Sequence, residues 1–328
     1  MSISLRKKNH IDICLESDVQ SSLTNGFEQF RLIHNACPEK DFETFPISTT
    51  FLNHTISAPI LISSMTGGTE RAEMINHHLA LAAEELNLPF ALGSQRVFVD
   101  KGKLDDLQAI RRDAPTIPVL ANIGAVQLNF GYGKDSLLQI VDSVEAEALI
   151  LHFNPLQEIL QPNGDTNFAG LLPKIEAICR NFPVPIVAKE VGNGFSLETA
   201  RQFAEAGIEW IDVAGAGGTS WAKVESLAAG QQLSGDVTAV FEDWGIPTAD
   251  CIASIHQALP EMNLIASGGI RNGVEIRKAC LMGAKICGLA LPLLKPALKS
   301  SQAVKEVLEN LIFQYRTAAF LSTGIEKI

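Results

Sequence analysis

Basic residues are scarce in this sequence relative to acidic ones. The 328 residues include 26 Lys and Arg against 37 Asp and Glu, which sets the formal net charge at -11. Nonspecific binding to nucleic acid needs a basic face, so this balance argues against nucleic acid as a partner. If the ligand is an anion, the positive charge that binds it must be gathered locally.

Metal-binding cysteine pairs and long apolar runs are absent as well. The six cysteines form no CxxC pair, and most follow or precede apolar residues, as buried thiols do in a reduced compartment. The apolar stretch 286–294 is far too short to span a bilayer. The first ten residues lack the apolar core of a signal peptide. We therefore expect a cytoplasmic protein without a membrane partner.

Short apolar runs alternate with helical patterns after residue 58. Strands that are apolar throughout, separated by amphipathic helices such as those at 74–86 and 304–315, indicate a parallel sheet covered by helices. Eight such units predict an α/β protein with a (β/α)8 TIM-barrel fold. A doubly wound sheet is the alternative, but no GxGxxG follows the first strand. The eight runs lie at 59–65, 88–93, 118–124, 148–154, 185–191, 210–216, 264–270 and 286–294.

Two segments depart from this rhythm. Residues 1–58 predict an irregular N-terminal extension covering the barrel mouth, and residues 59–328 a single barrel. Residues 217–245 predict a long loop after the sixth strand, which holds Trp221 and Glu225. Long loops in compact domains tend to be functional or mobile.

Polar side chains are concentrated at 152–158, where the fourth predicted strand ends. This stretch, His-Phe-Asn-Pro-Leu-Gln-Glu, places an imidazole, two amides and a carboxylate at the edge where α/β enzymes keep their active sites. A capped strand end would account for Asn154 and Pro155. It would not account for Gln157 and Glu158, so we favour a functional site.

Two further features point to the same edge. Gly268 and Gly269 expose backbone N–H groups, and Asn272 with Glu275 predicts a capping box that starts a helix. On the loop after the seventh strand, this pattern predicts a phosphate site rather than only a tight turn. Lys189 lies within an apolar strand. It could pair with Glu190 or Glu158, but we favour a role facing a cofactor that acquires negative charge.

Eight motifs in order resemble those of the type II isopentenyl-diphosphate isomerases, FMN-containing enzymes of (β/α)8 fold. Several are weak alone, but eight in order are highly specific, and together they cover nearly the whole chain. The motifs are RKxxH from Arg6, SMTGG from Ser64, GSQR from Gly93, ANIGA from Ala121, HFNPLQE from His152 with QPxGD from Gln161, KEVGNG from Lys189, AGAGGTSW from Ala214 and SGGIRNG from Ser267.

The resemblance implies isomerisation of isopentenyl diphosphate to dimethylallyl diphosphate with reduced FMN, Mg²⁺ and NAD(P)H as the reductant. It also implies a homo-oligomer, either a tetramer or an octamer. The FMN contacts carried over are Ser64, Met65, Thr66, Ser94, Asn122, Lys189 and Thr219, with Gly268, Gly269, Ala290 and Leu291 holding the phosphate through their backbone. Ala214 stands where many relatives have Ser, a departure at one flavin phosphate contact.

The substrate site is implied in the same way. Glu158 would ligate Mg²⁺, and the catalytic residues would be Gln157, Lys189 and His152. The substrate-binding residues would be Arg6, Lys7, His10, Ser94, Gln95, Arg96, Asn154 and Gln157. Lys8 and Asn9 occupy positions where acidic residues are common in the family.

The reaction moves a proton between allylic carbons without net redox change. Few side chains at this site titrate suitably, so reduced flavin could act as the acid–base group through N5. We expect Lys189 to stabilise the anionic flavin and Gln157 to position the substrate or relay a proton. We also expect residues 1–10 to close over the substrate, although their basic side chains could belong to a solvated terminus.

Three alternatives compete with this hypothesis. An FMN-dependent 2-hydroxy-acid oxidase on the same barrel would use a histidine base after the sixth strand, where this chain has 214–219 without histidine. An IMP-dehydrogenase-like enzyme would need a nucleophilic cysteine, and 217–245 contains none. A flavin-storage protein would have no need for Glu158 or Arg96.

Overall fold

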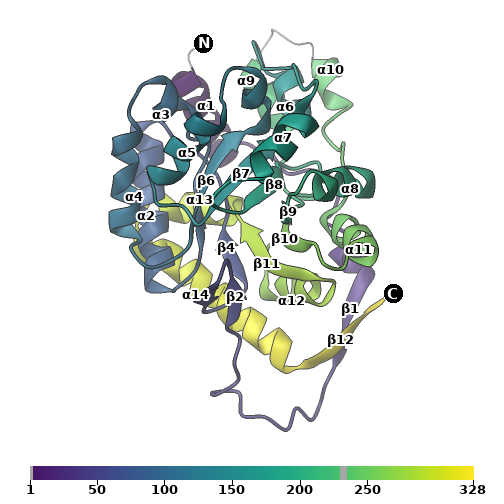
Figure 1. Ribbon diagram of the computed structural model, residues 1–328. Helices are drawn as coiled ribbons and strands as arrows, with labels where there is room; N and C mark the ends of the chain where they lie inside the picture. The colour runs from purple at the N-terminus through teal and green to yellow at the C-terminus, as the bar shows by residue number, and fades with distance from the viewer. Residues whose placement is uncertain (1–2, 230–234) are drawn as a thin grey trace.

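The computed structural model describes residues 3–229 and 235–328, and within these ranges eight parallel strands form a closed barrel (Figure 1). Each strand pairs with the next along the chain, and the last pairs with the first. The predicted TIM barrel is therefore confirmed. Its strands are β4 (Ile60–Ile62), β5 (Phe90–Ala91), β6 (Val119–Gly124), β7 (Ala148–Phe153), β8 (Ile186–Glu190), β9 (Trp210–Asp212), β10 (Asn263–Ser267) and β11 (Ala284–Leu289).

Helices cover the outside of the barrel. Several begin at side-chain caps, in which a hydroxyl or amide oxygen accepts a backbone N–H of the first turn. Thr69, Ser196, Asn272 and Ser300 are such caps. The main covering helices are α2 (Glu70–Glu85), α4 (Gln108–Asp113), α5 (Lys134–Asp142), α7 (Leu171–Cys179), α8 (Leu197–Glu205), α11 (Thr248–Ala258), α12 (Gly273–Leu281) and α14 (Ser301–Phe320).

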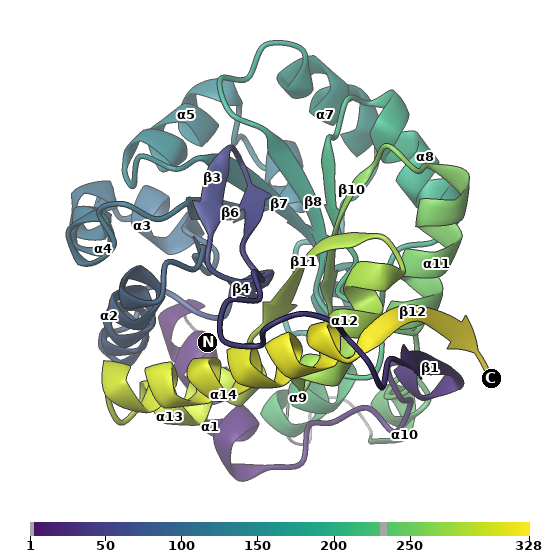
Figure 2. The same cartoon turned by 90° about the horizontal axis from the view of Figure 1, so that it is seen from below.

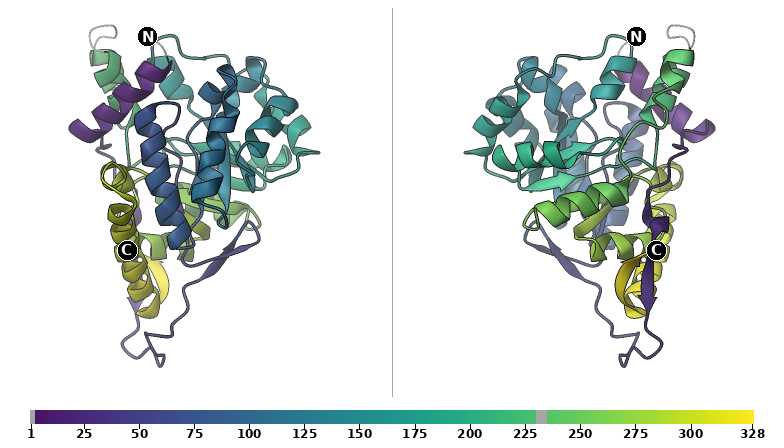
Figure 3. Two further views of the ribbon diagram at one scale, coloured as in Figure 1. Left: turned by 90° about the vertical axis from the view of Figure 1, so that its left-hand side faces the viewer. Right: turned by 90° about the vertical axis from the view of Figure 1, so that its right-hand side faces the viewer.

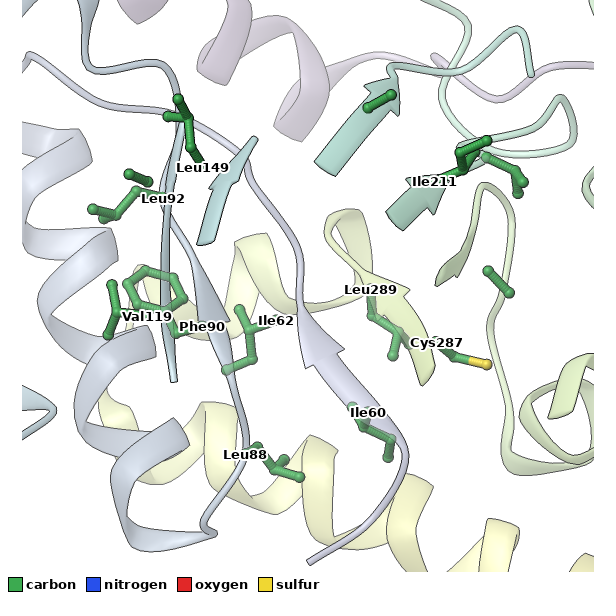
Figure 4. Close-up of a cluster of buried hydrophobic side chains, with 14 of the residues drawn as sticks. Ile60, Ile62, Leu88, Phe90, Leu92, Val119, Leu149, Ile211, Cys287 and Leu289 are labelled. Atoms are coloured by element: carbon green, nitrogen blue, oxygen red, sulfur yellow. The ribbon is translucent and has the colours of Figure 1, made fainter. Parts of the chain in front are cut away.

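Side chains alternate along the strands between an outer and an inner layer. Ile60 and Ile62 pack outward with the helices, as Figure 4 shows for them and for Phe90, Val119 and Leu149. The residues between them point inward. The inner layer consists of Leu61, Ala91, Leu120, Ala148, Ile150, Val187, Trp210, Ile265 and Ile286. Both layers are buried and apolar, and this packed frame positions the side chains at the barrel mouth.

The same alternation carries polar groups into the mouth. Two residues beyond an inward-facing apolar residue, the chain again points inward, now at the carboxyl end of the strand. Leu120, Ile150, Val187, Trp210 and Ile265 are inward-facing. The residues two positions further along are Asn122, His152, Lys189, Asp212 and Ser267.

A hairpin lies against the inner layer at the opposite end of the barrel, in front of the strands in Figure 2. Its strands are β2 (Thr49–Phe51) and β3 (His54–Ile56). Phe51 and Ile56 belong to the inner apolar layer, and the Phe51 ring meets Trp210 edge-on at 5.0 Å. This end is therefore filled with apolar side chains, and the polar groups lie at the other end.

The N-terminal extension contains more regular structure than expected. Helix α1 (Ile3–Glu16) lies near α9 (Trp221–Ala229) at the upper end of the barrel in Figure 1. Strand β1 (Phe30–His34) pairs with β12 (Ser322–Lys327), and 35–48 protrudes at the opposite end from the N-terminus (Figure 3). The helix went unpredicted because its basic residues interrupt any apolar stripe. Residues 1–2 lie outside the described part.

Two sequence expectations need correction at their boundaries. The last apolar run, 286–294, is not one strand: β11 ends at Leu289 and α13 (Leu291–Ala297) follows. Short apolar runs do not by themselves distinguish a strand from a buried helix. The expected loop 217–245 contains α9 (Trp221–Ala229) and α10 (Gly235–Ala239), and its residues 230–234 lie outside the described part. In the remaining residues, no helix combines the length and apolar character needed to cross a membrane.

Candidate active site

A cavity of about 290 Å³ opens at the carboxyl ends of the barrel strands. Its wall combines residues of α1 with residues at the ends of the barrel strands, so motifs far apart in the sequence meet there. The predicted site residues that line it are Arg6, Lys7, His10, Ser64, Met65, Thr66, Ser94, Arg96, Asn122, His152, Asn154, Gln157, Glu158, Lys189, Thr219, Gly268, Gly269, Ala290 and Leu291.

Gln95 is placed differently from the other predicted site residues. Its side chain is buried, and it does not line the cavity. Its Oε1 accepts the backbone N–H of Asn122 at 2.9 Å, and its Nε2 lies 3.5 Å from Ser143 Oγ. These contacts make Gln95 a support for β6, not a residue that faces a ligand.

Lys189 is held by an acidic residue that sequence reasoning did not single out. Its Nζ donates to Asp212 Oδ2 at 2.8 Å and to Ser267 Oγ at 3.3 Å. Ser267 Oγ in turn donates to Asp212 Oδ1 at 2.5 Å. Asp212 could have been found from its place two residues after the inward-facing Trp210. The ammonium reaches the cavity as one member of a buried, hydrogen-bonded network.

Glu190, one of the two partners suggested for Lys189, has another role in the structure. Its Oε2 accepts the backbone N–H groups of 191–194 at 2.5–3.2 Å, so it holds the turn after β8. Burial raises the pKa of Glu190 to about 7, and these backbone donors oppose that rise. The other suggested partner, Glu158, lies in a separate cluster.

His152 is kept neutral by its surroundings. Burial, with the nearby Lys7 and Lys189 charges, lowers the pKa of His152 to about 4. Its Nδ1 lies 2.7 Å from Asn122 Oδ1, and Asn122 Nδ2 donates to Ser64 Oγ at 2.9 Å. Because the Asn122 oxygen must accept, Nδ1 carries the proton and Nε2 is left as an acceptor.

Glycines let two loops pack closely around the region expected to hold a phosphate. A Cβ at Gly218 would lie 2.6 Å from Gly269 N, and one at Gly268 would lie 2.1 Å from Gly215 O. Thr248 Oγ1 donates to Gly268 O at 2.6 Å. Larger residues would force these loops apart, so this backbone cradle fits the phosphate end of FMN.

Glu158 accepts three hydrogen bonds. Asn154 Nδ2 donates to its Oε1 at 3.0 Å, the Asp165 backbone N–H donates to its Oε2 at 2.7 Å, and Gln161 Nε2 also donates to Oε2. Within the described residues, no group of three or more His, Cys, Asp or Glu could hold a metal ion. A metal at Glu158 would therefore need ligands from a bound anion or water.

Positive charge is gathered on one side of the cavity in an otherwise acidic protein. Arg6 and Lys7 come from α1, and Arg96 comes from α3 (Arg96–Asp100). Lys7 Nζ donates to Ser94 O at 3.1 Å. Burial and the charges of Arg6, Arg96 and Lys101 lower the pKa of Lys7 to about 8. Like charges held together destabilise one another, so the arrangement fits an anionic ligand.

Gln157 is tied to a buried carboxylate of α9. Its Nε2 donates to Glu225 Oε1 at 2.9 Å, and that oxygen also lies 3.2 Å from His10 Nε2. The His10 ring meets Trp221 edge-on at 5.5 Å. Sequence reasoning noted Glu225 only as part of the segment after the sixth strand. Its role in the site could not be read from the sequence, since 68 residues separate it from Gln157.

Comparison with known proteins assigns a family. The family model described as FMN-dependent dehydrogenase matches residues 155–328. An isopentenyl-diphosphate delta-isomerase of Nostoc sp. is 51% identical over 96% of this chain and 90% of that protein. The enzyme of the same name from Oceanobacillus iheyensis is 44% identical over 97% of this chain and 91% of that protein.

Solved structures share the fold at lower identity. A mandelate oxidase crystal structure superimposes with a TM-score of 0.64 at 17% identity, covering 98% of this chain and 94% of that one. At this identity the likeness concerns the fold alone.

Proposed function

The chain belongs to the isopentenyl-diphosphate delta-isomerase family, within the FMN-dependent dehydrogenases, and we infer from this that it converts isopentenyl diphosphate into dimethylallyl diphosphate. The observation that carries the proposal is the local concentration of Arg6, Lys7 and Arg96 on one cavity in a chain of net charge -11. An anionic substrate would neutralise these three positive charges when it binds. The glycine cradle in the same cavity supports a second anionic group, the phosphate of FMN.

FMN would be held by the barrel, which we propose as one FMN-binding domain at residues 59–328. The backbone of Gly268, Gly269, Ala290 and Leu291 would hold the phosphate. When bound and reduced, FMN supplies an acid–base group that can exchange a proton with an allylic carbon. The side chains proposed to contact the cofactor are Ser64, Met65, Thr66, Ser94, Asn122, Lys189 and Thr219.

Three side chains would carry the chemistry of the protein itself. Lys189, fixed by Asp212, would place a positive charge beside the cofactor and favour its anionic form. Gln157, held by Glu225, would position the hydrocarbon part of the substrate or relay a proton. Neutral His152 would orient the substrate through Nε2 without adding a charge.

The diphosphate would lie between the barrel and helix α1 of the proposed N-terminal extension, residues 1–58. Arg6, Lys7 and Arg96 would neutralise its charge, with His10, Ser94 and Asn154 around it. Mg²⁺ would bind Glu158 together with diphosphate oxygens and water. These are needed because, among the described residues, Glu158 belongs to no group of three or more potential metal ligands of the His, Cys, Asp or Glu type. This arrangement predicts that metal and diphosphate bind cooperatively.

The fold and the dehydrogenase family also allow an FMN-dependent 2-hydroxy-acid oxidase. Such an enzyme needs a histidine base after the sixth strand, and 214–219 contains none. The cation cluster suits a diphosphate better than a single carboxylate. We therefore place this function second.

NAD(P)H is the proposed reductant. We propose that the protein is a tetramer or octamer and that it is located in the cytoplasm. The unpaired cysteines support a reduced compartment, since none of the six forms a disulfide in the part of the chain that the structure describes.

The proposal is tested by incubating the purified protein with isopentenyl diphosphate and Mg²⁺ under anaerobic conditions. The expected protein is yellow, and dimethylallyl diphosphate should form only after the flavin is reduced. Reduction of the flavin by a 2-hydroxy acid, with no isomer formed from the diphosphate, would favour the alternative.

A further inference from the structure

Two amide side chains in the cavity have oxygen atoms without partners. Gln127 and Asn154 are 3% and 5% exposed and line the same cavity. Within the described residues, neither Gln127 Oε1 nor Asn154 Oδ1 has a hydrogen-bond partner. Buried acceptors of this kind are rare because burial removes their water without replacement. Each is therefore available to accept a hydrogen bond from a ligand or water in the cavity.

Both amides are oriented by their nitrogen atoms. Gln127 Nε2 donates to Asp165 Oδ2 at 3.0 Å. Asn154 Nδ2 donates to Glu158 Oε1 and to Gln157 Oε1, both at 3.0 Å. Rotating either amide would bring its oxygen against those acceptors. The hydrogen bonds of their own nitrogens thus fix the two unpartnered oxygens, on residues that line the cavity.

The acidic residues that orient the amides are also connected. The backbone N–H of Asp165 donates to Glu158 Oε2 at 2.7 Å, so the two residues belong to one hydrogen-bonded cluster. Asp165 also pairs with Arg96, the cation of α3. Phosphate oxygens would be repelled by the free amide oxygens. Water bound to a divalent cation is a strong hydrogen-bond donor, so the amide oxygens would attract it. Mg²⁺ usually keeps several such waters.

We propose that Gln127 is a positioning residue for the metal: its Oε1, with Asn154 Oδ1, accepts hydrogen bonds from water bound to the ion held by Glu158 and the diphosphate. The inference rests on the proposed function, and it adds a residue that the sequence motifs did not indicate. This arrangement explains why a single carboxylate suffices. Glu158 and the diphosphate supply the negative charge, and two neutral amide oxygens hold the water bound to the ion.

The test measures binding of Mn²⁺ to the FMN-loaded protein in the presence of inorganic pyrophosphate, by loss of the free-ion electron paramagnetic resonance signal. Gln127→Met removes the oxygen and keeps the volume. Gln127→Glu keeps an oxygen at that position. Both lose the N–H that reaches Asp165, and the Glu variant also sets a carboxylate against it, so a purely structural role predicts a defect in Gln127→Glu at least as large as in Gln127→Met. Gln139→Met, on the exposed face of α5, is the matched control.

We expect Gln127→Met to weaken Mn²⁺ binding about tenfold, Gln127→Glu to stay within about threefold of the unaltered protein, and Gln139→Met to match it. FMN content should not change. Gln127→Leu replaces the Met variant if the latter does not retain FMN. Unaltered Mn²⁺ affinity in Gln127→Met, or a loss in the Glu variant at least as large as in the Met variant, would overturn the proposal, as would a lack of Mn²⁺ binding by the unaltered protein.

This measurement involves no turnover, so it is independent of the isomerase assay. A protein that isomerises its substrate but shows no loss of metal affinity in Gln127→Met would contradict this inference alone. A protein that shows the expected metal-binding pattern but forms no dimethylallyl diphosphate would contradict the proposed function alone.

Discussion

The Lys189 ammonium lies 2.8 Å from the Asp212 carboxylate, and both side chains are buried at the mouth of the barrel. The pairing follows from strand register, because Lys189 on β8 lies directly beside Asp212 on β9. A buried charge without its partner is costly, so the two residues depend on each other. The charge that we propose to act on the cofactor is therefore oriented before any ligand binds.

Lys189→Met should lower isomerase activity by orders of magnitude, since one preorganised charge contributes about 3–4 kcal/mol to transition-state stabilisation. It should also destabilise the fold by leaving Asp212 unpaired. Thermal unfolding, FMN absorbance and turnover measure the three effects. The double variant Lys189→Met with Asp212→Asn should recover the stability but not the activity. Recovery of turnover in the double variant would refute the role of Lys189.

Glu158→Gln and Gln157→Ala should respond differently to metal. The first removes the charge proposed to bind Mg²⁺, so high Mg²⁺ should partly recover its activity. The second removes an amide that Glu225 holds in place, so added metal should not help. Initial rates across a Mg²⁺ titration distinguish them. Identical responses would show that the two neighbours do not divide the work as proposed.

Substrate affinity should fall as the pH rises above about 8. The pKa of Lys7 is lowered to about 8 by burial and by neighbouring cations, so the free protein loses this charge above that pH. Diphosphate prefers the protonated form, and binding then takes up a proton. KM measured from pH 7 to 9.5 should increase. In Lys7→Met, KM should be higher at pH 7, and the rise of KM that comes from Lys7 deprotonation should vanish. If Lys7→Met kept the pH profile of the unaltered protein, Lys7 would not be the group that titrates.

His152 should affect stability only in acid. Its pKa is lowered to about 4, below the ordinary value of about 6.5, so the folded protein binds fewer protons than the unfolded chain between these values. Stability from this group is complete above pH 6.5 and is lost as the pH falls toward 4. His152→Asn should therefore show a smaller drop in melting temperature between pH 6.5 and 4.5. An equal drop in both proteins would mean that His152 titrates normally.

Much of the barrel was predictable, because its signal is local. Eight apolar runs marked the eight strands, and the carboxyl ends of these runs placed Asn122, His152 and Lys189 at one edge. Asp212 was accessible to the same argument, since a carboxylate two residues after an inward-facing apolar residue must also face the mouth. The strand ends thus predicted where the site lies better than they predicted the hydrogen-bond partner of each site residue.

Contacts between distant segments could not be predicted. Glu225 reaches Gln157 only because α9 packs on both α1 and α6 (Pro155–Leu160). The orphaned oxygen of Gln127 depends on the placement of Asp165, 38 residues further along the chain. Gln95 belonged to a conspicuous motif, yet its side chain turns toward β6. The hydrophobic pattern of the sequence indicates which residues reach the barrel mouth. Their rotamers and hydrogen-bond partners depend on how distant segments pack.

The most direct test of the account is the ratio of NAD(P)H consumed to dimethylallyl diphosphate formed, measured without oxygen. An isomerisation has no net redox change, so reductant is needed only to bring the flavin to its reduced state. We predict many product molecules for each NAD(P)H oxidised, with reductant consumption stopping once the flavin is reduced. Oxidation of one NAD(P)H for every product molecule would contradict the account.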